Sequence, residues 1–191
     1  MNTSHTIFFV GKPGCGKGTQ SKLLAEHTGW PIFASGKLFR DIAKEDTPVG
    51  HKTKEYDEKG LLQPHWFAMY LYLKSLFSIP NDQSAIFDGF NRKIQEAELV
   101  ISSLGWLGRK FSIVNLQVSD EDVHTRLASR KETSGRADDH MVDERLREFY
   151  AHTEPAIEVF RNAGALIDVD GGSSRTEAEI ASSIRKALGI A

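Results

Sequence analysis

The sequence predicts an α/β fold built on a mostly parallel sheet. Short apolar runs alternate along the chain with longer segments of helical pattern, as strands alternate with crossover helices. The first apolar run, Ile7–Val10, leads through a glycine-rich turn into a helical pattern at Ser21–Glu26. No internal repeat, low-complexity stretch or linker divides the 191 residues, so a single domain is expected. The expected strands are His5–Val10, Pro31–Phe33, Ser84–Asp88, Phe111–Val118 and Ala165–Val169.

Local signals place several of the expected helices. Pro64 suits the first turn of a helix, where its missing N–H needs no partner, and the residues after it form a broad apolar face that we expect to pack in the core. Ser119 with Asp122, and Ser174 with Glu177, have the spacing of capping boxes and indicate two later helix starts. The apolar face after Pro64 comprises Trp66, Phe67, Met69, Tyr70, Leu71, Leu73 and Leu76.

Two segments do not fit the alternation of strand and helix. Residues 34–63 are polar and charged, with Gly50 and Gly60 as breakers, and are expected to form a small helical lobe. Lys131–Gly135 is expected to be a short polar connection between two helical segments. Surface loops are the simplest interpretation of both, but arginines flank each of them, which makes both candidates for a functional role.

Composition and charge exclude several classes of protein. Hydrophobic residues make up 40% and charged residues 26% of the chain, as in an ordinary globular domain. The formal net charge of −2 argues against a general binder of nucleic acid or of membrane surfaces. Cys15 is the single cysteine, which excludes an internal disulfide and a zinc site with several thiolates. Because we see no apolar signal region and no long apolar span, a cytoplasmic location is expected.

The turn after the first expected strand has the chemistry of a phosphate-binding loop. Its sequence, Gly11–Gln20, is GKPGCGKGTQ. Glycines let backbone N–H groups converge on an anion, and the N-terminus of the following helix adds partial positive charge. Lys17 is placed to reach the outer phosphates of a nucleotide. The loop departs from the generic pattern G-x-x-x-x-G-K-[ST], because Gly18 follows the lysine and the hydroxyl comes at Thr19.

A second polar motif follows another expected strand. Asp88–Arg92, with the sequence DGFNR, stands at the carboxyl end of that strand, where open parallel sheets bind their ligands. A carboxylate there, near a phosphate loop, suits a hydrated magnesium ion. An arginine there suits a bidentate grip on phosphate oxygens. The two motifs together predict a magnesium-dependent nucleotide site.

Four arginines surround the later polar connection. Arg126 and Arg130 are four residues apart in a helical pattern, so they project from one face. Arg136 follows the connection, and Arg145 lies on the next expected helix. Such a set could close over a polyphosphate and exclude water. Solvated surface charge is the alternative, mainly for Arg130 and Arg145.

These motifs, in this order, resemble the adenylate kinase (nucleoside monophosphate kinase) family, in its form with a short lid. The resemblance covers nearly the whole chain and implies a P-loop three-layer α/β/α fold with a five-stranded parallel sheet. It implies a core of residues 1–33, 64–129 and 138–191, a small helical monophosphate-binding lobe of residues 34–63, and a short lid of residues 130–137. The stretches that carry it are Gly11–Gln20, Ser35–Arg40, Gly60–Pro64, Asp88–Arg92, Arg126–Arg130 and Gly135–Asp139.

The resemblance also implies a reaction and a set of residue roles. A monomer would transfer the γ-phosphoryl group of Mg-ATP to a nucleoside monophosphate, with AMP as the first choice. The catalytic residues would be Lys17, Arg92, Arg126, Arg136 and Arg145. ATP would be bound by Gly14, Cys15, Gly16, Lys17, Gly18, Thr19, Arg126 and Arg130. The monophosphate would be bound by Ser35, Gly36, Arg40, Leu62, Gln63, Gly89, Arg92 and Glu96, and magnesium by Asp88 through water and by Thr19.

Four positions depart from the family pattern, and they bear mostly on the acceptor. The family usually has Asp in place of Lys37 and Pro in place of Asn91. Gln63 replaces an apolar residue that faces the acceptor base, and the glutamine that reads adenine aligns with Glu96. A carboxylate accepts hydrogen bonds from an exocyclic amine but donates none, which still favours adenine or cytosine. Two alternatives stay open: a kinase for CMP, UMP or a deoxynucleoside monophosphate, and a nucleotide-binding regulatory module with weak or no kinase activity.

Overall fold

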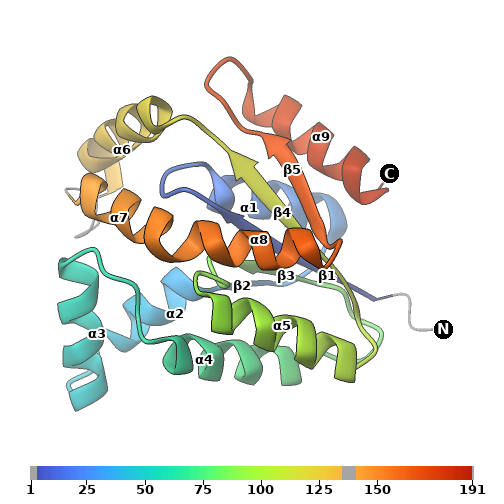
Figure 1. The fold of residues 1–191 in the computed structure, drawn as a ribbon, viewed down its shortest axis with the longest axis horizontal. Coiled ribbons are helices and arrows are strands. Elements are labelled where there is room, and N and C mark those ends of the chain that lie inside the picture. The colour runs from blue at the N-terminus through green and yellow to red at the C-terminus, as the bar shows by residue number, and fades with distance from the viewer. Residues whose placement is uncertain (1–3, 135–140, 191) are drawn as a thin grey trace.

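The structure is a computed structural model in which residues 4–134 and 141–190 are described, the side chains of residues 130–134 excepted. Each strand is followed by one or more helices before the next strand begins (Figure 1). The strands are β1 (His5–Gly11), β2 (Ile32–Ala34), β3 (Ala85–Asp88), β4 (Lys110–Gln117) and β5 (Leu166–Asp170). The helices are α1 (Lys17–Thr28), α2 (Ser35–Ile42), α3 (Pro48–Glu58), α4 (His65–Phe77), α5 (Ile94–Trp106), α6 (Asp120–Ser134), α7 (Val142–Glu148), the π-helix η1 (Phe149–Thr153), α8 (Glu154–Asn162) and α9 (Glu177–Leu188).

The strands form one parallel sheet in the order β2-β3-β1-β4-β5. Phe9 of β1 and Ala34 of β2 both pair with Asp88 of β3, and Gly11 at the end of β1 pairs with Leu116. The predicted five-stranded parallel sheet is therefore confirmed, with each strand within one residue of its expected limits. Because all strands run the same way, their carboxyl ends share one edge, which is where such sheets bind ligands.

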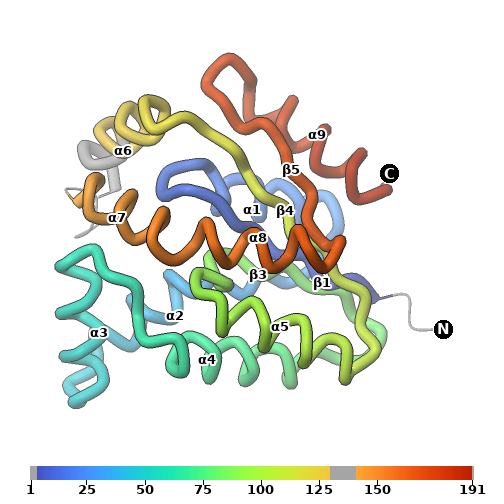
Figure 2. The backbone as a smooth tube through the Cα atoms, viewed as in Figure 1, coloured from blue at the N-terminus to red at the C-terminus, as the bar shows by residue number. Residues whose placement is uncertain are grey.

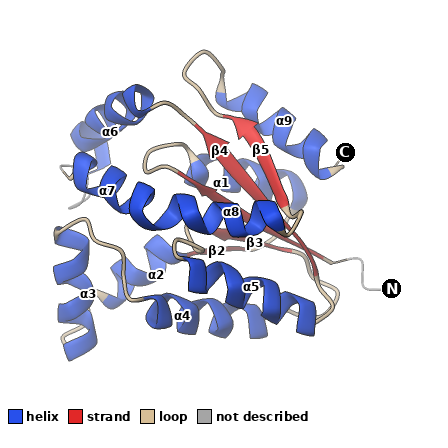
Figure 3. Cartoon of the chain, in the orientation of Figure 1, coloured by secondary structure: helices blue, strands red, loops and turns tan. Residues whose placement is uncertain are grey.

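Helices cover both faces of the sheet, as Figure 3 shows, and β1 supplies side chains to both. Phe8 and Val10 pack with residues of α4, α5 and α8, whereas Ile7 and Phe9 pack with α1 and α9. Successive side chains of a strand point to opposite faces, so an unbroken apolar run is what a strand buried on both faces requires. This packing gives the expected three-layer α/β/α architecture.

The predicted apolar face of α4 is only partly in the core. Phe67, Met69, Leu71 and Leu76 are buried as expected. Trp66 and Tyr70, however, are 64% and 57% exposed, so their assignment to the core is wrong. On a helix only about half of a wholly apolar surface can face one neighbour, and α4 turns these two rings away from the sheet.

One of the two predicted capping boxes is misplaced. At the start of α6, the Ser119 hydroxyl accepts the Asp122 N–H at 3.0 Å, as expected. The α9 box is formed by Thr176 and Glu179, which exchange hydrogen bonds of 3.3 and 2.7 Å, rather than by Ser174. Both Ser174 with Glu177 and Thr176 with Glu179 have the spacing of a capping box. The course of the loop before α9 makes Thr176 the capping residue.

Two expectations about the polar segments are corrected. Gly50 is not a breaker, because it lies in the first turn of α3, where the Thr47 hydroxyl accepts its N–H at 3.0 Å. A Cβ at Gly50 would lie 2.2 Å from the Glu45 carbonyl oxygen, so glycine is required there for space. The predicted connection Lys131–Gly135 is wrong for residues 131–134, which continue α6 to Ser134.

Candidate active site

The carboxyl edge of the sheet opens into a cavity of about 970 Å³. It lies between the loop after β1, the ends of β2 and β3, the segment after α3, and the elements α6 to η1. The structure brings almost the whole predicted site to its wall. The predicted residues that line it are Gly14, Cys15, Gly16, Lys17, Gly18, Thr19, Ser35, Gly36, Arg40, Leu62, Gln63, Asp88, Gly89, Arg92, Glu96, Arg126 and Arg145. The side chain of Arg130 and all of Arg136 lie outside the described residues.

The loop after β1 wraps around one end of the cavity through glycines with positive φ. Gly11, Gly14 and Gly16 have φ values of 133°, 73° and 99°. A Cβ at Gly11 would lie 2.6 Å from the Leu116 carbonyl oxygen, so β4 leaves no room for a side chain. Gly16 caps α1 without a side-chain hydrogen bond, and the first turn of α1 has no acidic residue. This helix N-terminus therefore keeps the partial positive charge that attracts an anion.

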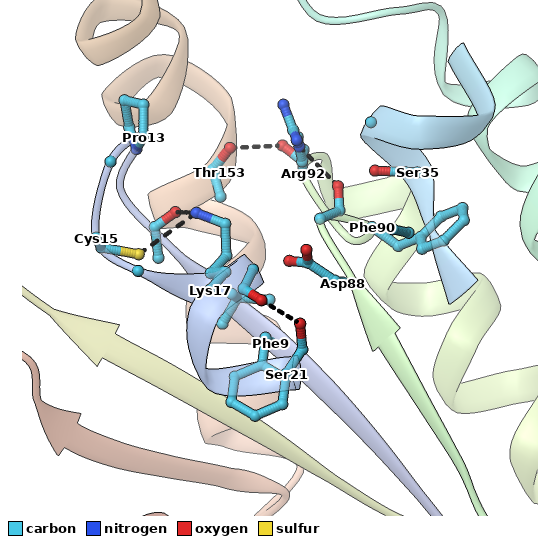
Figure 4. Close-up of a pocket in the computed structure, with 18 of the residues that line it drawn as sticks. Phe9, Pro13, Cys15, Lys17, Ser21, Ser35, Asp88, Phe90, Arg92 and Thr153 are labelled. Carbon is cyan, nitrogen blue, oxygen red and sulfur yellow. Dashed lines mark hydrogen bonds between the residues drawn. The ribbon is translucent and has the colours of Figure 1, made fainter. Parts of the chain in front are cut away.

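Lys17 folds back over this loop. Its Nζ donates to the carbonyl oxygens of Gly11 and Lys12, both at 2.8 Å, and lies 3.4 Å from the Cys15 sulfur. Figure 4 shows Lys17 next to Cys15, with Asp88 on the neighbouring side of the cavity. The flexible amine is thus held at the mouth of the loop by neutral acceptors, which an anionic phosphate can outcompete.

Asp88 ends β3 beside the start of α1. Its Oδ2 lies 3.5 Å from the position that a Cβ of Gly18 would take, so the carboxylate lies against the first turn of α1. Thr19 lines the same part of the cavity. A carboxylate and a hydroxyl with open space before them fit a hydrated magnesium ion that phosphates also ligate. Within residues 4–134 and 141–190, no group of three or more His, Cys, Asp or Glu could hold a metal by itself.

A second basic cluster lies on the opposite wall, between β2 and β3. The Arg92 Nε donates to the Gly89 carbonyl at 2.7 Å, and the Arg92 carbonyl accepts the Thr153 hydroxyl at 3.2 Å (Figure 4). A Cβ at Gly89 would lie 2.8 Å from the Ser35 hydroxyl oxygen, so glycine lets these groups converge. Arg40 lies against Gly36 of the same helix, α2. Both arginines therefore line the cavity close to the start of α2.

Arg126 and Arg145 enter from the helices on either side of residues 135–140. Arg126 donates to the carbonyl oxygen of Cys15 at 3.3 Å and to that of Gly171 at 2.7 Å, joining the phosphate loop to the loop after β5. Arg145 lies beside Gly60, at the exit of α3. Guanidinium groups thus reach the cavity from several elements, although the whole chain has a net charge of −2.

Two buried polar residues, Gln63 and Glu96, line the cavity. The Glu96 carboxylate is 2% exposed and accepts the Arg92 N–H at 2.8 Å. Burial raises the pKa of Glu96, and the hydrogen bond and nearby cationic side chains partly offset this. Gln63 is 8% exposed, and its amide nitrogen donates to α3. Both departures from the family pattern therefore line the cavity.

Some residues of the cavity wall belong to no functional motif in the sequence. Asp57, Glu148, Arg175 and Glu177 also line it. The Glu148 carboxylate accepts the Leu62 N–H at 3.0 Å, across 86 residues of chain. Each is a charged residue within or next to a helix, where solvent exposure is the ordinary expectation. Only the tertiary arrangement distinguishes them from surface charges.

Comparison with known proteins agrees with the geometry. The profile of the family described as adenylate kinase matches residues 9–165. The chain is 34% identical to an adenylate kinase of Thermus thermophilus, with both chains covered completely. It is 34% identical to adenylate kinase 1 of a Nostoc species, over 90% of this chain and 92% of that protein. An adenylate kinase of Caldicellulosiruptor saccharolyticus is 29% identical over 96% of this chain and 99% of its own.

The fold, the phosphate loop and the arginine-lined cavity are thus accompanied by similarity over the full length of the chain. Within the part of the chain that the structure describes, none of the helices is long and apolar enough to cross a bilayer. The chain belongs to the adenylate kinase family and is an ATP-dependent phosphotransferase that acts on nucleoside monophosphates.

Proposed function

We propose that the protein transfers the γ-phosphoryl group of Mg-ATP to AMP, giving two molecules of ADP. The observation that carries the proposal is a single cavity with a phosphate loop on one wall and the pair Arg40 and Arg92 on the other. One anion site belongs to the donor and the other to the acceptor. The relatives named adenylate kinase support AMP as the acceptor.

The donor nucleotide would bind along the loop after β1. The N–H groups of Gly14, Gly16 and Gly18 and the N-terminus of α1 would hold its phosphates. Arg126, which already bridges Cys15 and Gly171, has a planar guanidinium that could stack on the adenine. Arg130 and Arg136 would add charge from the lid.

The acceptor phosphate would lie against Arg40 and Arg92, near the Ser35 hydroxyl. That hydroxyl is buried and has no hydrogen-bond partner among the described residues, so an incoming phosphate oxygen or ribose hydroxyl would satisfy it. Gly36 and Gly89 keep the approach open. Leu62, Gln63 and Glu96 would surround the base.

Transfer itself would depend on position and charge. Lys17 would leave the carbonyl oxygens of Gly11 and Lys12 and follow the phosphoryl group in flight. Arg92, Arg126 and Arg145 would neutralise charge on the equatorial oxygens. Because the acceptor phosphate is already anionic, no general base is strictly needed.

Magnesium fits the carboxylate of Asp88, through water, and the hydroxyl of Thr19. When bound, the ion neutralises the β- and γ-phosphates of ATP. The Asp88 carboxylate, held at the end of a central strand, would orient the water molecules around the ion.

We further propose that residues 34–63 form a mobile monophosphate lobe and residues 130–137 a short lid on a core of residues 1–33, 64–129 and 138–191. Closure of both would exclude water, which otherwise consumes ATP. Because one chain supplies both phosphate sites, the protein would act as a monomer, and its modest net charge agrees with a cytoplasmic enzyme that binds neither nucleic acid nor membranes.

The test is a coupled assay of nucleoside diphosphate formation with ATP, magnesium and each of AMP, CMP, UMP, GMP and their deoxy forms, with an EDTA control. Turnover that is fastest with AMP and is abolished by EDTA is expected. A preference for another monophosphate would correct the acceptor. ATP binding without turnover would replace the kinase by a regulatory module.

The role of Lys17 is tested by Lys17→Ala. We expect kcat to fall by about 100- to 1,000-fold, because the charge that follows the phosphoryl group is removed. The thermal unfolding midpoint should change little, since the Lys17 amine bonds to acceptors of the loop itself. Lys186→Ala, which removes an exposed lysine of α9, is the matched control and should keep the wild-type kcat. Normal turnover in Lys17→Ala would contradict the proposed donor site.

A further inference from the structure

The amide of Gln63 is held by α3. Its nitrogen, Nε2, donates to the backbone carbonyl of Thr53 at 3.0 Å and to the carboxylate of Asp57 at 3.2 Å. Thr53 is 1% and Gln63 8% exposed, so water competes little for these bonds. An amide nitrogen carries two hydrogens, and both are used here.

These contacts determine which way the amide faces. Rotation of the amide group by 180° would place its oxygen, Oε1, against a carbonyl oxygen and a carboxylate oxygen, which are both acceptors. Two hydrogen bonds would be lost, and leaving a buried polar group unsatisfied is costly. Gln63 can therefore offer only an acceptor, Oε1, to anything else. No donor in residues 4–134 or 141–190 binds that oxygen.

The cavity is lined by other acceptors as well. Asp57, Gln63 and Glu96 all line the cavity, together with the apolar side chains of Leu62 and Phe90. The Glu96 carboxylate takes its hydrogen bond from the Arg92 N–H and, when charged, has no hydrogen to donate. A planar base bound in this cavity therefore has both apolar side chains and acceptor oxygens available to it.

We propose that Asp57, acting through Gln63, selects monophosphates whose base carries an exocyclic amine at C6 of a purine or C4 of a pyrimidine. Adenine and cytosine present an NH₂ donor at the position where hypoxanthine and uracil present a carbonyl oxygen. An amine donates to Gln63 Oε1, whereas a carbonyl leaves two acceptors in contact, an uncompensated desolvation that sites built for hydrogen bonding discriminate strongly. This rests on the proposed function, because it places the acceptor base against Gln63. Asp57 is a positioning residue, since it acts by fixing the glutamine amide.

The experiment compares matched substrates that differ at that one group. kcat and KM are measured for AMP against IMP, and for CMP against UMP, with wild type, Asp57→Asn and Asp57→Ala. In Asp57→Asn the new amide can donate to Gln63 Oε1, so the glutamine loses the carboxylate that fixes it. We expect the AMP-to-IMP ratio of kcat/KM to fall about tenfold, mainly through a higher KM for AMP, with kcat nearly kept.

Glu58→Gln is the matched control. It removes one negative charge from the next residue of α3, where Glu58 is paired with Lys54 at 3.8 Å and does not line the cavity. Its AMP-to-IMP ratio should stay within about twofold of wild type, since exposed ion pairs contribute little. A control that moved the ratio as much as Asp57→Asn would overturn the role of Asp57.

Calorimetric titration with AMP and with IMP, without ATP, gives the same ratio as dissociation constants and does not depend on turnover. If both Asp57 variants keep the wild-type AMP-to-IMP ratio, or lose the two ligands equally, the inference is wrong and the kinase assignment stands. If the wild-type protein phosphorylates no monophosphate at all, the proposed function fails and takes this inference with it.

Discussion

Asn91 is a residue whose conformation is strained next to the site. Its φ of 66° makes it the one residue other than glycine with positive φ among the described residues. The side chain is fully buried, and both amide atoms lack partners in that part of the chain. Each such feature costs on the order of 1–3 kcal/mol. Because Asn91 directly precedes Arg92, we infer that its unfavourable conformation lowers stability but orients the backbone of Arg92.

His5 makes folding stability depend on pH. It is 8% exposed in β1, where its Nε2 lies 3.0 Å from the Ser112 hydroxyl oxygen. Burial, together with the nearby Lys110 charge, lowers the pKa of His5 from 6.5 to about 4. Between these values the unfolded chain binds the proton and the folded chain does not, so stability is present above pH 6.5 and is lost as the pH falls toward 4.

We therefore expect His5→Gln to lose less stability in acid than wild type. Urea unfolding at pH 7 and pH 4.5 measures the effect, and the wild-type free energy of unfolding should fall by about 2 kcal/mol more than that of the variant. Carboxylates that titrate in this range contribute equally to both proteins and cancel. An identical fall in the two proteins would show that His5 is not held neutral.

At the scale of one element, glycines in two helices should respond in opposite ways to alanine. In Gly50→Ala the new Cβ would meet the Glu45 and Ile42 carbonyl oxygens at 2.2 and 2.8 Å, which are backbone atoms that cannot move aside. We expect a loss of about 2–3 kcal/mol in the free energy of unfolding. Gly105 in α5 has open space around its Cβ position, so Gly105→Ala should gain about 0.5 kcal/mol. Denaturant titration shows whether each variant is more or less stable than wild type. A more stable Gly50→Ala variant would contradict the packing between α2 and α3.

The start of α9 offers a test of where the helix begins. Thr176→Ala removes a hydroxyl that accepts the Glu179 N–H, and the carboxylate of Glu179 also accepts from Thr176. Loss of an N-cap of this kind costs about 1 kcal/mol. Ser174→Ala is the control, since Ser174 is exposed and does not cap the helix, and it should cost almost nothing. Thermal unfolding of the two variants measures both losses. A larger loss in Ser174→Ala than in Thr176→Ala would show that Ser174 and Glu177 form the capping box.

At the scale of the whole molecule, the elements after β4 are tied to both phosphate sites. Lys12 of the phosphate loop bonds to Asp120 at the start of α6, at 2.5 Å, and Tyr150 of η1 donates to the same carboxylate at 2.7 Å. Leu62 bonds to Glu148 of α7, and Figure 2 shows the chain after α3 passing beside that helix. A movement of α6 to η1 would therefore displace residues of both phosphate sites.

The Leu62–Glu148 contact predicts a link between α7 and the acceptor. Glu148→Ala leaves the Leu62 N–H without its charged acceptor, a bond of a kind that contributes about 1.5–3 kcal/mol. We expect KM for the monophosphate to rise about tenfold, while KM for ATP changes less than threefold. Glu154→Ala, at an exposed acid of α8, is the control and should behave as wild type. Equal effects on the two KM values would mean that the contact stabilises the fold as a whole instead of the acceptor site.

Much of the fold and of the candidate site follows from local sequence. Ile7–Val10 and the glycines after it specify a buried strand and a phosphate loop, because backbone conformation and burial are encoded within a few residues. The exposed rings of Trp66 and Tyr70 and the cap at Thr176 could not be predicted in this way. In each case two local solutions have similar energies, and the neighbouring elements decide between them.

The fold class, the family and the phosphate-binding groups could be predicted from the amino-acid sequence, since these depend on short motifs and their order. How groups distant in the chain combine became visible only in the folded chain. Folding joined Gln63 to Asp57 and Thr53, brought Glu148 to Leu62, and placed two basic clusters on facing walls of one cavity. The physical reason is that hydrogen-bond direction and burial depend on packing between elements, which no local pattern encodes.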